Sequence, residues 1–146
     1  MCSTPDVQCQ RRLHSNVLPK MSRCIHPKVL NANIREGFCQ KLDENDCCLQ
    51  QNLVDIACIT ETWLNPLIPS SLTDIDGYVT YRDDGRQGGG VAIFVKEGLL
   101  CRLLDLPNVH QFDTLWLLYR HPRMPRELSH VLLGCVYFSQ VQVLAK

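Results

Sequence analysis

The sequence predicts an α/β fold built on a mixed sheet, and two observations carry that prediction. Residues 28–60 hold a strand, a helix and a second strand in succession, which is typical of a parallel βαβ unit. Residues 77–137 then hold short apolar segments separated by turn residues, a pattern typical of antiparallel strands. The combination favours a mixed-sheet layer fold over a purely parallel, doubly wound one.

The βαβ unit is assigned from the lengths and apolar runs of its three parts. KVLNANI at 28–34 is short and apolar enough for a buried strand, and VDIACIT at 54–60 is interpreted as a second one. Residues 39–51 between them are expected to form a helix, so a right-handed crossover between parallel strands is predicted. The apolar face of this helix is expected to contain Leu42, Leu49 and Leu53.

The remaining strands are placed by the turns between them. Residues 77–81 and 91–95 flank a charged, glycine-rich connection, which indicates a hairpin. Further strands are expected at 99–106, 113–120 and 131–137.

Length and composition indicate how many domains the chain contains. A chain of 146 residues with 45% hydrophobic content suffices for one domain with a real core. We assign that domain to residues 28–138. Residues 1–27 are polar and show no period, so a poorly ordered leader is expected there, and residues 139–146 form an unassigned tail.

Charge and cysteine content exclude several classes of protein. Lys plus Arg and Asp plus Glu both count 15, so any nucleic-acid role has to come from a local site and not from an overall basic charge. The nine cysteines are odd in number and show no C-x-x-C spacing, which argues against a disulfide framework or a zinc site. No secretory signal and no apolar run long enough to span a bilayer is found. We therefore expect an intracellular, non-membrane protein with free thiols.

Two polar side chains follow the strands of the βαβ unit. Asn33 closes the first strand and Glu61 follows the second, and the functional edge of an α/β sheet lies just past such carboxyl ends. An amide oxygen beside a carboxylate is a pair of oxygen ligands that suits Mg²⁺, which in turn can polarise a phosphodiester oxygen. The alternative is that both residues only cap strands or form turns.

Five motifs along the chain resemble, in order, those of the endonuclease/exonuclease/phosphatase superfamily, in the branch carried by non-LTR (LINE-type) retrotransposons. They are LNANIR at 30–35, VDIACITETWL at 54–64, GGGVAIFV at 88–95 with DGY at 76–78 before it, FDTLWL at 112–117 and GCVY at 134–137. The TETWL and GGGVAIFV segments favour this branch over the lipid- and inositol-phosphate phosphatases of the same superfamily.

The resemblance implies a fold and a set of site residues. The family fold is a four-layered α/β sandwich of two facing mixed sheets, and its activity is Mg²⁺-dependent phosphodiester cleavage, with Mn²⁺ as an alternative ion. Asn33 would orient metal and phosphate, Glu61 would be a metal ligand, and Tyr137 would contact the scissile phosphate. In retrotransposons the substrate is DNA, which is nicked before reverse transcription.

The sequence departs from the family pattern after Tyr137. The residues that follow are Phe138 and Ser139, where the family has a proline two positions on, and the later aspartate–asparagine and serine–aspartate–histidine motifs have no counterpart before Lys146. We therefore expect a truncated, inactive N-terminal part of the fold, mostly the first sheet with one crossover helix. Absence of the second sheet would expose an apolar face and lead to self-association. The alternative function is a non-catalytic interaction or binding module.

Overall fold

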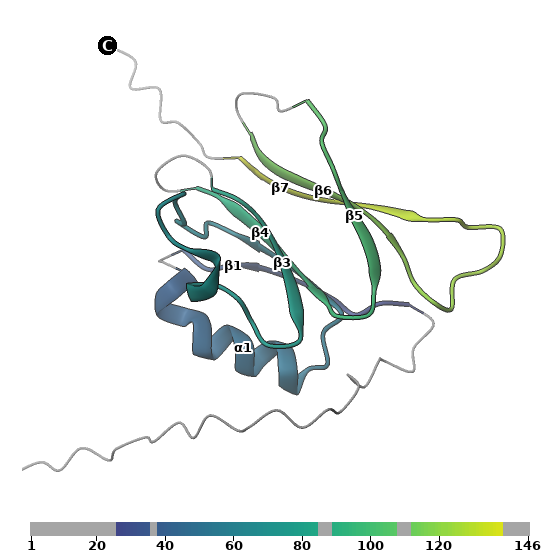
Figure 1. The fold of residues 1–146 in the computed structure, drawn as a ribbon, viewed down its shortest axis with the longest axis horizontal. Helices are drawn as coiled ribbons and strands as arrows, with labels where there is room; N and C mark the ends of the chain where they lie inside the picture. Colours follow the sequence, from purple (N-terminus) through teal and green to yellow (C-terminus); the bar gives the residue numbers. More distant parts are fainter. Residues whose placement is uncertain (1–25, 36–37, 85–88, 108–111, 139–146) are drawn as a thin grey trace, which may run out of the picture.

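The computed structural model describes residues 26–35, 38–84, 89–107 and 112–138. Within these ranges the chain forms two β-sheets and one α-helix, arranged in layers (Figure 1). The predicted α/β fold with a mixed sheet is confirmed. Residues 1–25 of the predicted leader and the tail at 139–146 lie outside the described residues. None of the described helical segments is long and apolar enough to cross a membrane.

The first sheet is mixed and has the strand order β1-β2-β4-β3. Its strands are β1 (Val29–Asn33), β2 (Ile56–Thr60), β3 (Tyr78–Asp83) and β4 (Val91–Lys96). β1 and β2 are parallel, and the chain between them forms a 3-10 turn, η1 (Phe38–Lys41), and the helix α1 (Leu42–Gln51). β4 runs antiparallel to both β2 and β3, so the predicted βαβ unit and the predicted hairpin are both confirmed.

A second, antiparallel sheet with the order β5-β6-β7 forms another layer (Figure 1). Its strands are β5 (Leu100–Leu104), β6 (Phe112–Arg120) and β7 (Val131–Phe138). The expectation that the second sheet is absent is therefore wrong. Side chains alternate along a strand, and this alternation turns an apolar row of β6 toward the first sheet. The three strands thus cover a face that the sequence was expected to leave open.

The two sheets enclose an apolar cluster, which we call the inter-sheet core. From the first sheet it takes Ile56, Cys58, Val91, Ile93, Val95 and the following Leu99, and from the second Leu115, Leu117, Tyr119 and Cys135. All six residues of β4 are buried, because sheet β5-β6-β7 covers one face of this strand and α1 covers the other. A continuous apolar run such as VAIFV is what a strand covered on both faces requires.

The helix packs on the opposite face of the first sheet. Leu49 of α1 is buried there, and Leu42 is half-buried against the same cluster. Phe38 of η1 and Phe94 of β4 are fully buried, and their rings stack with centroids 5.1 Å apart. Burial of two aromatic rings in contact is a large apolar contribution for a small domain, so this pair anchors the helical layer to the sheet.

Two local predictions are wrong. β1 is not a buried strand: its residues alternate between exposed and half-buried, because within the described residues it is the edge of the sheet and pairs only with β2. Leu53 does not belong to the apolar face of the helix. It lies after α1 in the left-handed region, with φ 50°, and is 47% exposed.

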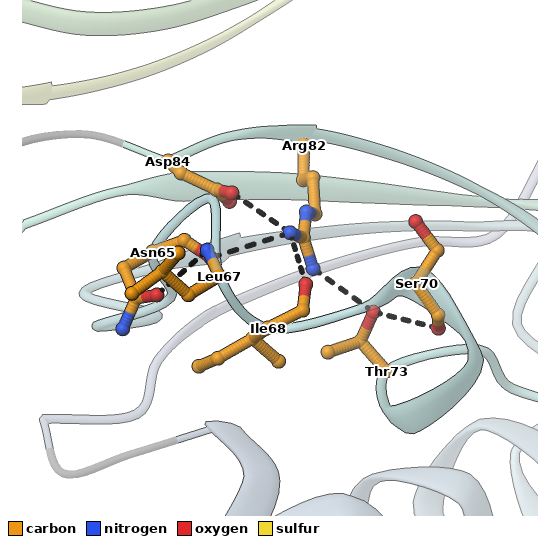
Figure 2. A network of polar contacts seen from close by, with 7 residues as sticks. All are labelled: Asn65, Leu67, Ile68, Ser70, Thr73, Arg82 and Asp84. Atoms are coloured by element: carbon orange, nitrogen blue, oxygen red, sulfur yellow. Dashed lines mark hydrogen bonds and ion pairs between the residues drawn. The ribbon is translucent and has the colours of Figure 1, made fainter.

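Arg82 on β3 holds the loop that follows the βαβ unit, residues 65–73, which contains the 3-10 turn η2 (Ser70–Leu72) (Figure 2). Its guanidinium donates hydrogen bonds to the backbone oxygens of Ile68 at 2.6 Å and Asn65 at 3.4 Å and to Oγ1 of Thr73 at 3.4 Å, and it pairs with Asp84 at 2.8 Å. A planar guanidinium with five N–H donors suits such a set of acceptors. The loop is thereby fixed against the first sheet.

Tyr78 makes the fold sensitive to alkaline pH. Its hydroxyl donates to the backbone oxygen of Val54 at 2.6 Å, and burial, with the negative charges of Asp55 and Asp46, raises the pKa of Tyr78 to about 12. The unfolded chain releases this proton near pH 10, so the stability linked to it is fully present below pH 10 and is lost as the pH rises through about 12. Urea denaturation is expected to show a decline over this range that is shallower in Tyr78→Phe. Equal slopes would contradict this assignment.

Candidate functional site

Asn33 and Glu61 lie side by side at the carboxyl edge of the parallel strand pair. The β1–β2 register places Asn33 opposite Thr60, so the residue after Thr60 leaves the sheet beside Asn33. Nδ2 of Asn33 donates a hydrogen bond to Oε1 of Glu61 at 2.8 Å. The two side chains that the sequence singled out are therefore in direct contact.

Tyr137 reaches the same carboxylate from the second sheet. It lies on β7, and its hydroxyl donates to Oε1 of Glu61 at 3.0 Å. The pKa of Tyr137 is raised, first by burial, then by this hydrogen bond and by the negative charges of Glu61 and Asp113. Three strands from two sheets thus bring together the three predicted site residues, which we call the Glu61 cluster: Asn33, Glu61 and Tyr137.

The hydrogen bonds within the Glu61 cluster distinguish the two carboxylate oxygens. Asn33 and Tyr137 both donate to Oε1. Oδ1 of Asn33 accepts a hydrogen bond from the backbone N–H of Arg35 at 3.2 Å, which turns the amide nitrogen toward Glu61. Within the described residues Oε2 of Glu61 accepts no hydrogen bond, so it is the oxygen available to a cation.

The backbone around Glu61 is held in an uncommon conformation. Glu61 and Trp63 have φ values of 57° and 53°, in the left-handed region that non-glycine residues rarely adopt. Backbone hydrogen bonds hold this turn, from Thr62 N–H to the oxygen of Gly90 at 3.3 Å and from Trp63 N–H to the oxygen of Gly89 at 2.9 Å. Such backbone strain is often found at functional sites, where the surrounding structure maintains it.

Asp113 belongs to this arrangement, and the sequence did not single it out. It lies on β6 directly opposite Tyr137, and its Oδ2 accepts the backbone N–H of Gly90 at 2.9 Å. Gly90 in turn accepts the N–H of Thr62, so Asp113 is linked through one glycine to the turn that presents Glu61. Its place in the FDTLWL motif was the one signal that could have indicated it.

Replacement of Asp113 separates its charge from its hydrogen bond. Asp113→Asn keeps an acceptor oxygen but removes the negative charge, whereas Asp113→Ala removes both. Since the charge of Asp113 helps to raise the pKa of Tyr137, an absorbance titration is expected to show a lowered pKa for Tyr137 in both variants. The amide NMR signal of Gly90 is expected to move strongly in Asp113→Ala alone. An unchanged titration in both variants would remove Asp113 from the site.

A pocket of about 470 Å³ adjoins the Glu61 cluster. It lies between β1, β2 and β7 and is lined by Val29, Asn31, Ala32, Asn33, Cys58, Thr60, Leu133, Gly134, Cys135, Val136 and Tyr137. Two members of the Glu61 cluster, Asn33 and Tyr137, form part of its wall. A bound group in this pocket would therefore lie next to the carboxylate.

The donor set fits a hard, partly hydrated cation. The described residues contain no group of three or more His, Cys, Asp or Glu side chains able to hold a metal ion. The single carboxylate of Glu61 resembles the way Mg²⁺ is often bound, by one or two carboxylates with several waters retained, whereas Asn33 turns its amide nitrogen and not its oxygen toward Glu61. The chemistry of the Glu61 cluster thus matches an oxygen-bound divalent ion and not a thiolate- or imidazole-bound one.

Comparison with known proteins shows the fold. No protein-family model and no curated protein matches the chain. Among solved structures it is similar to the crystal structure of the AP endonuclease LMAP from Leishmania major, at 20% sequence identity and a TM-score of 0.57. The similarity covers 76% of this chain and 40% of that one, so the chain spans less than half of that structure's length. The two share a mixed α/β architecture of the AP endonuclease type.

Proposed function

We propose that the Glu61 cluster is the metal-binding part of a phosphodiesterase site of the DNA endonuclease type. The main observation behind the proposal is that Asn33, from the first sheet, and Tyr137, from the second, both donate hydrogen bonds to the carboxylate of Glu61. The shared fold with an AP endonuclease supports a nuclease-type reaction. The resemblance of the TETWL and GGGVAIFV segments to retrotransposon endonucleases supports DNA as the substrate.

Each residue of the Glu61 cluster has a distinct task in this proposal. Glu61 binds Mg²⁺ or Mn²⁺ through Oε2, and Asn33 and Tyr137 fix the rotamer of Glu61 by donating to Oε1. Because the pKa of Tyr137 is raised, its hydroxyl keeps its proton at neutral pH, and it can turn from Glu61 to donate that proton to a phosphate oxygen. The ion, when bound, polarises the phosphodiester and stabilises the charge that develops in the transition state.

Turnover by the described residues is proposed to be very slow. Cleavage of a phosphodiester by water needs a group that positions or activates the attacking water. Within the described residues, the groups bonded to Glu61 are the amide of Asn33 and the phenol of Tyr137. Asp113 lies opposite Tyr137, and its Oδ2 already accepts the N–H of Gly90. The Glu61 cluster therefore supplies metal and phosphate binding without a free general base.

Binding and cleavage of DNA test the two parts of this proposal separately. Fluorescence anisotropy is expected to show that the full chain binds an oligonucleotide better with Mn²⁺ than with chelator, and that Glu61→Ala removes the difference. Plasmid nicking by the wild-type chain is expected to stay at the level of Glu61→Ala. Glu44→Ala, on the exposed first turn of α1, is the matched control.

Three outcomes are informative. Equal anisotropy with and without metal would refute the metal-dependent site. Robust nicking that Glu61→Ala abolishes would support the site and refute the slow turnover. A response of Glu44→Ala equal to that of Glu61→Ala would show that the effect is one of overall charge.

A second function, association with another copy of the chain, is favoured by one surface. The outer face of sheet β5-β6-β7 exposes large apolar side chains, and three of them are about half exposed: Leu132, Val136 and Phe138. Exposed apolar patches of this kind often mark contacts between proteins. Light scattering during size exclusion is expected to show a concentration-dependent dimer that Leu132→Lys disperses. A monomer at all concentrations would refute this function and leave the Glu61 cluster untouched.

A further inference from the structure

Two cysteines from opposite sheets meet beside the Glu61 cluster. Cys58 lies on β2 and Cys135 on β7, and both carry free thiols in the inter-sheet core. They are 6% and 3% exposed. The two side chains lie near enough for each thiol to shift the pKa of the other through a hydrogen-bonding interaction.

Small molecules have a route to this pair. Both cysteines line the pocket of about 470 Å³ that adjoins the Glu61 cluster. The pocket is large enough for small polar solutes such as peroxide, because a single water needs only about 30 Å³. The two thiols are therefore shielded from bulk solvent but accessible to small solutes in the pocket.

The two thiols differ in acidity in a way that assigns their roles. The hydrogen bond from Cys135 lowers the pKa of Cys58, and the same contact, with burial, raises the pKa of Cys135. The thiolate is the reactive form of cysteine toward peroxides and disulfides. Cys58 is thus the group that reacts first, and Cys135 is placed to react with the product.

We propose that Cys58 and Cys135 form an oxidative modification site, at which hydrogen peroxide joins them in a disulfide between the two sheets. Disulfides between facing sheets are compatible with the interior of a sandwich, as in immunoglobulin domains. β2 and β7 come within 8 Å of one another between Cα atoms, and a disulfide takes Cα atoms roughly 4.4–6.8 Å apart. The bond therefore forms if the Cα atoms of Cys58 and Cys135 lie within, or move into, this range.

The reaction balances with one peroxide for each pair of thiols. The sulfur of Cys58 attacks one oxygen of hydrogen peroxide, the O–O bond breaks, and the departing hydroxide takes the thiol proton to form water. The resulting sulfenic acid is attacked by the sulfur of Cys135. An S–S bond forms, the S–O bond breaks, and hydroxide leaves with the proton of Cys135 as a second water. The two sulfur atoms are oxidised and the peroxide is reduced.

The disulfide would couple oxidation to the neighbouring site. Cys58 lies three residues before Glu61, and Cys135 lies two residues before Tyr137. The new bond therefore fixes the spacing of the two strands that carry the hydrogen bond from Tyr137 to Glu61. The modification itself does not depend on the proposed phosphodiesterase function.

Peptide mapping of the full chain tests the proposal directly. After stoichiometric hydrogen peroxide, alkylation and non-reducing digestion, we expect a cross-linked peptide containing Cys58 and Cys135, two daltons lighter than the sum of the two thiol peptides. Dithiothreitol is expected to reverse it. Because the bond closes a long loop, thermal denaturation of the oxidised chain is expected on the order of 10 °C above that of the reduced chain.

The controls use cysteines of the same chain. Cys101→Ser, which removes a half-buried thiol in contact with Tyr81, is expected to retain the cross-link. Cys58→Ser and Cys135→Ser are expected to lose both the cross-link and the thermal shift. Recovery of Cys58 and Cys135 as separate alkylated or sulfinic peptides from the wild-type chain, while exposed Cys39, Cys47 and Cys48 are oxidised, would overturn the proposal.

Discussion

Replacement of Glu61 with glutamine is expected to weaken Mn²⁺ binding at the Glu61 cluster by ~100-fold or more. Glutamine keeps the size of the side chain and one oxygen, but it removes the negative charge that an oxygen-bound divalent ion requires. The described residues contain no group of three or more candidate ligands that would compensate. Titration followed by the electron paramagnetic resonance of free Mn²⁺ measures the loss.

The same substitution is expected to change the acidity of Tyr137. The hydrogen bond to Glu61 and the charge of Glu61 both raise the pKa of Tyr137, so this pKa is expected to fall in Glu61→Gln. Glu44→Gln, an exposed carboxylate on α1, serves as the control and is expected to leave both quantities unchanged. Wild-type affinity in Glu61→Gln would mean that Mn²⁺ binds elsewhere.

Truncation of Phe94 to alanine is expected to destabilise the fold by about 3–5 kcal/mol. The side chain is fully buried, and its ring stacks on Phe38 at 5.1 Å in the core between the first sheet and the helix. Alanine removes the apolar area and leaves a cavity that rigid neighbouring strands cannot close. The free energy of unfolding of a small domain is only about 5–15 kcal/mol, so this substitution is expected to remove a large part of it. Urea denaturation followed by circular dichroism measures the change.

Val79→Ala is the matched control for this prediction. Val79 lies on β3 and is 43% exposed, so its truncation is expected to cost less than about 1 kcal/mol. If Phe94→Ala were as mild as Val79→Ala, the contact between the helix and the sheet would contribute little to folding.

The parallel strand pair could be predicted from the sequence because its signals are local. Apolar runs at 28–34 and 54–60, with a helix between them, are enough to predict adjacent parallel strands. Asn33 and Glu61 then follow from their positions at the strand ends, and the structure places them in contact. Tyr137 had no such local signal, since it meets Glu61 from another sheet. Its place in the site came from the resemblance alone.

The second sheet was missed for a physical reason. Alternation along a strand shows which residues share a face but does not show which sheet that face covers. Leu115, Leu117 and Tyr119 of β6 were recognisable as part of a strand, and their packing against β4 depends on the whole chain. The same holds for β1, whose apolar residues suited a buried strand although it lies at an edge.

Asp113 was missed because its contact is with a distant backbone group. A hydrogen bond from the N–H of Gly90 to its Oδ2 leaves no pattern in the sequence near either residue. Only the folded chain brings β6 against the turn at Gly89 and Gly90, and through that turn against Glu61. Positioning groups of this kind are visible in a structure and not in a single sequence.

Paramagnetic broadening of NMR signals by Mn²⁺ tests most directly whether the Glu61 cluster holds a divalent ion. Mn²⁺ takes the same oxygen ligands as Mg²⁺ and broadens only signals close to it. We expect the first losses at the side-chain amide of Asn33 and the backbone amides of Thr62 and Tyr137, and we expect Glu61→Gln to abolish them. Broadening centred instead on the acidic surface formed by Asp74, Asp76 and Glu97 would contradict the assignment.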